Sequence, residues 1–124
     1  MRALLIDDDS VDRQLICKLL KSTGLPVDVT EAEDAIAALD AISSEDFDCL
    51  LVDQRMPGII GTEFIRAFRD MKGDGAPIVV LSGEDANSLT AEQAVGAGGD
   101  FFLAKQDMTA GRLKAVLSCF EPKS

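Results

Sequence analysis

The chain has 124 residues, of which 47% are hydrophobic and 27% charged, which is the composition of one ordinary globular domain. Its formal net charge is −10 and its pI about 4.3, so it would repel phosphate backbones, and we expect no direct nucleic-acid binding. Its apolar runs are too short to cross a bilayer, and no signal-peptide pattern follows Met1. These features favour a cytoplasmic protein that makes no membrane contact.

The three cysteines are widely spaced, and the chain contains no histidine. The positions of Cys17, Cys49 and Cys119 indicate neither a disulfide framework nor a zinc site, and the apolar run around Cys49 is typical of a buried thiol. Because imidazole is absent, any bound metal would be held by oxygen atoms. This favours a hard cation such as Mg²⁺.

Short apolar runs alternate along the chain with segments that show helical periodicity. The runs predict buried parallel strands, because each is short, mostly apolar and ends at polar or turn residues. The predicted strands are Pro26–Thr30, Cys49–Val52, Pro77–Leu81 and Asp100–Ala104, preceded by Ala3–Ile6. The predicted helices are Ser10–Thr23, Glu33–Ile42, Gly61–Met71, Leu89–Val95 and Thr109–Phe120, with Ser10 as the N-cap of the first.

The apolar stripes of these helices predict which side chains face the core. Helical spacing joins Val11, Leu15, Ile16, Leu19 and Leu20 in the first helix, and one stripe joins Ala35, Ile36, Leu39 and Ile42 in the second. The predicted inward-facing residues are Phe64, Ile65, Phe68 and Met71 in the third helix and Leu113, Val116, Leu117 and Phe120 in the last. Five strands alternating with five helices predict an α/β fold, a three-layer doubly wound sandwich around a parallel sheet of strand order 2-1-3-4-5.

Polar side chains follow four of the five predicted strands. Asp7 and Asp8 follow the first strand, Asp53 the third, Ser82 the fourth and Lys105 the fifth. Each alone could be a turn or surface residue, but the carboxyl ends of parallel strands share one edge of a sheet, so these side chains should meet. Two carboxylates about 5 Å apart repel by ~3 kcal/mol at an effective dielectric constant of about 20. The cluster therefore predicts a divalent cation, Mg²⁺, among the carboxylates.

This set of groups suits phosphoryl transfer to a carboxylate. Asp53 can attack phosphorus, while Mg²⁺ and the Lys105 ammonium stabilise charge on the phosphoryl oxygens. The Ser82 hydroxyl can donate a hydrogen bond to a further oxygen. The predicted product is an aspartyl phosphate.

Over nearly its whole length, the chain resembles a receiver domain of two-component response regulators. The residues that carry the resemblance are Leu4–Asp8, Leu50–Asp53, Met56–Gly58 with Gly61, Val79–Gly83, and Phe102 before Lys105. The resemblance implies a flavodoxin-like fold, with the receiver domain over residues 1–121 and a tail or artificial end at 122–124. It also implies a phosphoacceptor that is not an enzyme and undergoes at most slow self-dephosphorylation.

By this resemblance, Asp53 is the phosphoacceptor, and Mg²⁺ is held by Asp7, Asp8, Asp53 and the backbone carbonyl of Arg55. Ser82 and Phe102 would form a switch pair that changes the surface of the fourth helix, fifth strand and fifth helix. The phosphoryl donor would be a sensor histidine kinase or a histidine phosphotransfer protein, recognised through apolar residues of the first helix near the acidic cluster. A downstream output protein or domain would read the change.

Two positions depart from the family pattern, and two other functions compete with this one. Gln106 follows Lys105 where the family usually has a proline preceded by a cis peptide, and Ile60 replaces a common aspartate.

A receiver-like binding module that is never phosphorylated would fit the Gln106 change. A Mg²⁺-dependent aspartyl-phosphate phosphohydrolase would fit the Asp7-Asp8-Asp9 run, although it leaves Asp53 and the following Pro57-Gly58 unexplained.

Arg55 and Glu84 generate a prediction about the lifetime of the phosphorylated state. Each lies two residues beyond a predicted site residue, at positions that in this family flank the path of the attacking water. We expect an ion pair between them to obstruct this water. Arg55→Ala should therefore shorten the phosphoaspartate half-life, measured by loss of acid-labile phosphate, and an unchanged or longer half-life would contradict the prediction.

Overall fold

The computed structural model describes residues 1–53, 55–56, 59–72, 76–82, 101–105 and 108–118. The five strands of the central sheet are β1 (Arg2–Ile6), β2 (Asp28–Ala32), β3 (Cys49–Asp53), β6 (Ile78–Ser82) and β7 (Phe101–Ala104). The helices in the described part are α1 (Ser10–Ser22), α2 (Ala35–Ser44), α3 (Gly61–Lys72) and α5 (Ala110–Ser118). Two short strands, β4 (Arg55–Met56) and β5 (Ile59–Ile60), pair with each other.

The central sheet has the strand order β2-β1-β3-β6-β7, and all neighbouring strands are parallel. Since β6 and β7 are the fourth and fifth predicted strands, this is the predicted order 2-1-3-4-5. The doubly wound α/β fold predicted from the sequence is therefore confirmed. The fourth helix, predicted over Leu89–Val95, lies outside the described residues.

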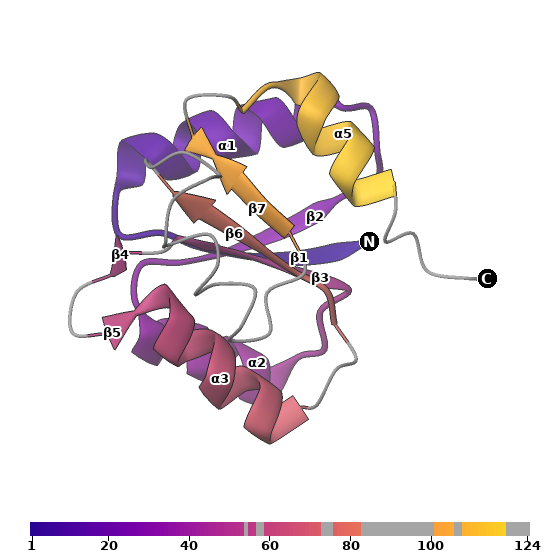
Figure 1. The fold of residues 1–124 in the computed structure, drawn as a ribbon. Coiled ribbons are helices and arrows are strands. Elements are labelled where there is room, and N and C mark those ends of the chain that lie inside the picture. The colour runs from indigo at the N-terminus through magenta and orange to yellow at the C-terminus, as the bar shows by residue number, and fades with distance from the viewer. Residues whose placement is uncertain (54, 57–58, 73–75, 83–100, 106–107, 119–124) are drawn as a thin grey trace.

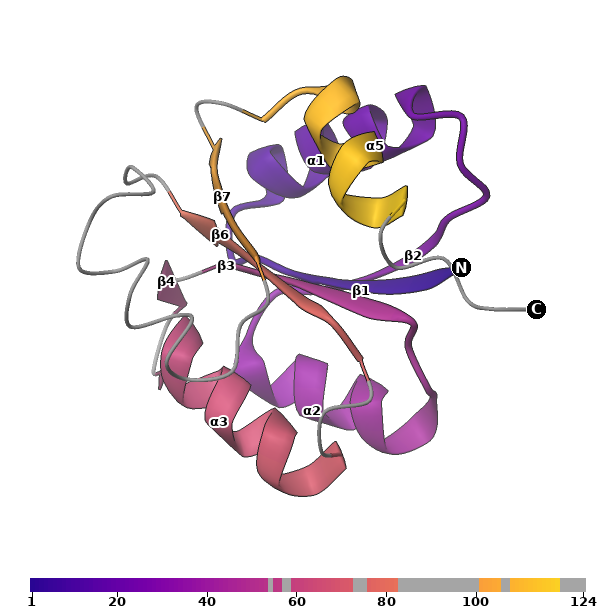
Figure 2. The same ribbon diagram turned by 45° about the vertical axis from the view of Figure 1, so that its right-hand side comes forward.

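The helices form two layers on opposite faces of the sheet, with α1 and α5 on one face and α2 and α3 on the other (Figures 1 and 2). Successive side chains of each strand enter different layers, because strand side chains alternate between the two faces. In β1, Leu4 and Ile6 pack in the core beneath α2 and α3, whereas Ala3 and Leu5 pack in the core beneath α1 and α5. Both faces of the central strands β1, β3 and β6 are thus buried, which explains why these strands read as continuous apolar runs, unlike the edge strand β2.

Four apolar residues of the helical stripes are exposed. Val11 and Leu15 on α1 have exposed fractions of 69% and 55%, Ile36 on α2 has 73%, and Met71 on α3 has 54%. Only Met71 among them was predicted to face the core, and that prediction was wrong. A helix on a sheet buries a narrower stripe than the apolar pattern covers. Phe120, also predicted to point inward, lies outside the described residues.

Aspartates cap the first two helices. Asp9, rather than the predicted Ser10, is the N-cap of α1, because its Oδ1 accepts a hydrogen bond from the Val11 N–H at 2.9 Å. Asp34 caps α2 in the same way, accepting a bond from the Ala37 N–H at 2.8 Å. A carboxylate at these positions satisfies free N–H groups and also interacts favourably with the helix dipole.

Strand β2 begins two residues later than predicted. Pro26 has no N–H group, and the ladder begins instead where the Asp28 N–H donates to the Met1 carbonyl at 2.8 Å. The β4–β5 pairing was not predicted at all, because Pro57-Gly58 between the two strands indicated only a break after β3. Those two residues lie outside the described part of the chain.

Two thiols lie within the described part of the chain, and neither is in a disulfide. Burial, with a smaller contribution from the charge of Asp48, raises the pKa of Cys49 to about 12, which confirms the predicted buried thiol. Burial also raises the pKa of half-buried Cys17. Neither thiol would be a nucleophile at neutral pH. Among the described residues, no helix combines the length and apolarity needed to span a bilayer.

The core beneath α2 and α3 predicts the effect of a large-to-small substitution. Phe64 is fully buried there, so Phe64→Ala should lower the free energy of unfolding by about 3–5 kcal/mol. Ile36→Ala in α2 is the control, since its 73% exposed side chain predicts a change within about 0.5 kcal/mol. Urea denaturation followed by far-ultraviolet circular dichroism measures both, and equal losses would contradict the assignment of the core.

Candidate functional site

Acidic residues end the two adjacent central strands β1 and β3. Ile6 lies opposite Val52 in the register of these strands, so Asp7 and Asp53 are the next residues of each. Each aspartate lies two residues beyond a leucine of the core beneath α1 and α5, so alternation directs both toward that face of the sheet. Asp7 is fully buried, and Asp53 is 6% exposed. Two carboxylates with little access to water therefore lie side by side.

Lys105 reaches these carboxylates from the end of the edge strand β7. Its Nζ atom lies 2.9 Å from Asp7 Oδ2, 2.8 Å from Asp12 Oδ2 and 3.5 Å from Asp53 Oδ2. Burial alone would lower the pKa of Lys105, but hydrogen bonds to Asp12 and Asp7 and the charge of Asp53 outweigh burial and raise the pKa above its ordinary value. The ammonium group therefore stays charged at neutral pH.

The carboxylate of Asp7 is fixed on both of its oxygens. Oδ1 accepts a hydrogen bond from the Asp9 N–H at 2.9 Å, and Oδ2 accepts one from Lys105. The Asp7 backbone N–H in turn donates to the Ala32 carbonyl of β2 at 3.1 Å. The turn between β1 and α1 thus holds the Asp7 side chain in a single orientation.

Asp12 was not predicted as a site residue, although it makes the shortest of the Lys105 contacts. It lies four residues before Ile16 and eight before Leu20, and these two are the buried residues of α1. Residues four apart share one face of a helix, so Asp12 continues the stripe that faces the sheet. This spacing could have identified it from the sequence.

Arg13 was also not predicted as a site residue, and it contacts the backbone of the turn that carries Asp7. Its guanidinium donates to the backbone carbonyl of Asp7 at 2.6 Å, and its Nε lies 3.3 Å from the carboxylate of Glu31 on β2. Nothing in the sequence pattern links this arginine to the turn after β1. Its contacts connect the acidic turn to the neighbouring strand.

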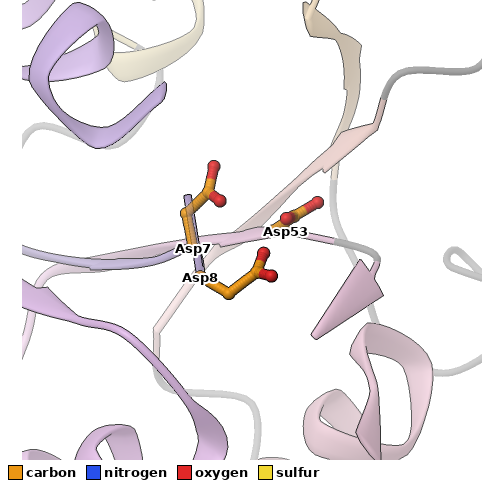
Figure 3. Close-up of side chains that lie close together, drawn as sticks. All are labelled: Asp7, Asp8 and Asp53. Atoms are coloured by element: carbon orange, nitrogen blue, oxygen red, sulfur yellow. The ribbon is translucent and has the colours of Figure 1, made fainter. Parts of the chain in front are cut away.

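Asp7, Asp8 and Asp53 form a cluster that could hold a metal ion. One carboxylate oxygen from each lies within 4.8 Å of the others, and Asp8 is exposed to solvent. Figure 3 shows the three side chains close together, with Asp7 and Asp8 just after the end of β1 and Asp53 at the end of β3. A set made only of carboxylate oxygens, with one open to water, fits a hard divalent cation that keeps part of its hydration shell. The same cation would reduce the repulsion within the cluster.

The structure thus brings Asp7, Asp8, Asp53 and Lys105 together. Of the other predicted site residues, Ser82 ends β6, where it lies opposite Ala104 of β7, Phe102 lies within β7, and Arg55 lies in β4. The structure does not describe the side chains of Ser82, Phe102 and Arg55, and Glu84 and Gln106 lie outside the described residues. The roles predicted for these five residues therefore stay predictions.

Comparison with known proteins gives a consistent assignment. The family model of the response regulator receiver domain matches residues 3–118. The response regulator MprA of Mycobacterium avium is 35% identical over 99% of this chain, which spans 54%, about half, of that protein.

Two solved structures resemble the fold closely. The signal receiver domain of NarL from Mycobacterium tuberculosis superposes with a TM-score of 0.84 at 32% identity, covering 98% of this chain and 97% of the other. The receiver domain of the sensor histidine kinase PA1611 from Pseudomonas aeruginosa, with a magnesium ion coordinated in its active-site cleft, gives a TM-score of 0.83 at 28% identity, covering 96% and 95%. The strand-end cluster, the sheet order and these matches together show that the chain belongs to the response regulator receiver domain family.

Proposed function

We propose that Asp53 accepts a phosphoryl group from a phosphohistidine of a sensor histidine kinase or a histidine phosphotransfer protein. The observation that carries this proposal is the charged Lys105 ammonium beside a carboxylate that is 6% exposed, at the edge of a metal-binding cluster. A carboxylate in this setting is shielded from bulk water, and the adjacent ammonium group can stabilise the negative charge of an incoming phosphoryl group.

Mg²⁺ is the proposed cofactor, held by Asp7, Asp8, Asp53 and the backbone carbonyl of Arg55. Two features support it: the oxygen-only donor set of this chain and the magnesium ion in the related PA1611 receiver domain. When bound, Mg²⁺ would offset the carboxylate charges and draw electron density from the phosphoryl oxygens.

In the proposed reaction, a carboxylate oxygen of Asp53 forms a bond to phosphorus while the nitrogen–phosphorus bond of the phosphohistidine breaks. The bonding electron pair of the broken bond returns to the imidazole nitrogen of the donor. Lys105 donates a hydrogen bond to one phosphoryl oxygen, and Asp7 holds this lysine in reach at 2.9 Å. Ser82 would donate to another oxygen from the end of β6.

The signal would leave the site through β7, which carries Phe102 and ends next to Lys105. Ser82 moving toward the phosphoryl group would open space for the Phe102 ring. The surface formed by the predicted fourth helix, β7 and α5 would then change its affinity for an output protein or domain. Charge-assisted hydrogen bonds worth ~1.5–3 kcal/mol each are sufficient to shift such an equilibrium.

The phosphoryl donor would dock beside the acidic cluster on α1. Val11 and Leu15, one helical turn apart, have exposed fractions of 69% and 55%. Apolar side chains exposed next to a reactive site are typical of a protein-binding surface. We expect the domain to act in the cytoplasm and to release phosphate at most slowly.

Metal binding can be tested by thermal unfolding with and without Mg²⁺. A ligand that binds only the folded state raises the midpoint temperature, by about 3–6 °C at tenfold the dissociation constant for a domain of this size. Asp8→Asn should raise the midpoint without Mg²⁺, because it relieves repulsion, and should remove most of the Mg²⁺-induced rise. Asp28→Asn removes a charge at the opposite end of the strands and should preserve the rise. A full Mg²⁺ response in Asp8→Asn would contradict the proposed ligands.

Phosphorylation can be tested with a small phosphoryl donor and with beryllofluoride, which imitates a phosphoryl group on a carboxylate. In the presence of Mg²⁺, the wild-type protein should gain acid-labile phosphate from acetyl phosphate and should bind beryllofluoride, observed by ¹⁹F NMR. Asp53→Asn should abolish both signals while its circular dichroism spectrum stays unchanged, because an amide oxygen is a far weaker nucleophile than a carboxylate.

The same assay separates the competing functions. A wild-type protein that responds neither to acetyl phosphate nor to beryllofluoride would be a receiver-like binding module. Steady turnover of p-nitrophenyl phosphate that is lost in Asp7→Asn but kept in Asp53→Asn would indicate a phosphohydrolase.

A further inference from the structure

Asp12 has a place in the site that the proposed reaction does not explain. It is not among the three carboxylates that could share a cation, yet its Oδ2 makes the shortest contact to Lys105, at 2.8 Å. Lys105 Nζ lies 0.7 Å farther from Asp53, at 3.5 Å, than from Asp12. The ammonium that should serve the phosphoryl group is therefore held by a carboxylate outside the metal cluster.

The packing of α1 fixes Asp12 in this position. The helix begins at the Asp9 cap, and Ile16, one turn beyond Asp12, is buried against the sheet. Beside the ion pair lies a small hollow of about 20 Å³ whose lining also includes the apolar side chains of Leu15, Ile16 and Met108. The Asp12 side chain is 36% exposed, so water screens the pair on one side only.

A count of formal charges shows how Asp12 changes the net charge of the site. The cluster carboxylates Asp7, Asp8 and Asp53 carry three negative charges, which Lys105 and a bound Mg²⁺ would balance. The fourth carboxylate, Asp12, makes the site negative by one charge before any phosphoryl group arrives. An incoming phosphoryl group brings further negative charge, so the fourth carboxylate opposes it.

We propose that Asp12 is a positioning residue that restrains phosphorylation, because it holds the Lys105 ammonium and offsets the positive charge that the phosphoryl group needs. This inference rests on the proposed function. It assigns to α1 a direct electrostatic control over the acceptor site. A chain with an uncharged residue at this position would have a more reactive acceptor.

The changes in anion affinity and cation affinity distinguish an effect of charge from a loss of structure. Removing a negative charge should strengthen the binding of an anion and weaken the binding of a cation at the same site. Loss of the correct geometry should weaken both. Mg²⁺ and beryllofluoride report on the two signs separately, and neither readout requires turnover.

The experiment compares the wild-type protein with Asp12→Asn, which keeps the side-chain shape and removes the charge. At saturating Mg²⁺, Asp12→Asn should bind beryllofluoride about three- to tenfold more tightly and gain phosphate from acetyl phosphate faster by a similar factor. Its Mg²⁺ affinity, measured by NMR titration without beryllofluoride, should fall about twofold or more. The beryllofluoride gain should shrink as the salt concentration rises.

Two controls define the effect. Asp12→Glu keeps the charge and should behave like the wild-type protein. Asp40→Asn removes one exposed charge from α2, on the opposite face of the sheet, and should change neither affinity. Unchanged or weaker beryllofluoride binding by Asp12→Asn would overturn the inference, as would an equal gain in Asp40→Asn. If the wild-type protein itself does not bind beryllofluoride, the proposed function fails, and this inference fails with it.

Discussion

The ion pair between Asp7 and Lys105 is the constraint on which both the fold and the site depend. Asp7 is fully buried, and a buried carboxylate without a partner would cost several kcal/mol. Its partner comes from a residue 98 positions later in the chain, at the far edge of the sheet. Strand β7 must therefore dock in the register that delivers this lysine to the end of β1. The ion pair that stabilises the buried carboxylate thus also brings the residues of the site together.

Much of this arrangement could be predicted from the sequence, because both the strand order and the alternation of side chains follow simple rules. Apolar runs with helices between them indicate a parallel sheet, and such a sheet gathers the ends of its strands at one edge. Asp7, Asp53 and Lys105 each lie two residues beyond a leucine of the same core, so alternation alone places them on one face. This shared two-residue spacing explains why side chains from three strands meet on one face of the sheet.

The features that sequence analysis missed depend on choices between equivalent local patterns. Asp9 and Ser10 are both good helix caps, and only the path of the turn after β1 selects the aspartate. Val11 and Leu15 belong to an apolar pattern wider than the stripe that the sheet can cover, so hydrophobicity alone could not show which residues remain exposed. Asp12 was missed because a charged residue in the first turn of a helix usually indicates only a favourable interaction with the dipole.

The charges of the site also couple the two ligands of the proposed function, the cation and the phosphoryl group. Asp7, Asp8 and Asp53 repel one another and would repel a phosphoryl group, and Lys105 offsets only part of their charge. Both repulsions would fall together if the carboxylates shared a divalent cation, so the proposed transfer to Asp53 would be more favourable with the cation already bound. By linkage, the phosphorylated site would then hold its cation more tightly than the free site would. No separate coupling element is needed, because the same few oxygen atoms determine the affinity for both ligands.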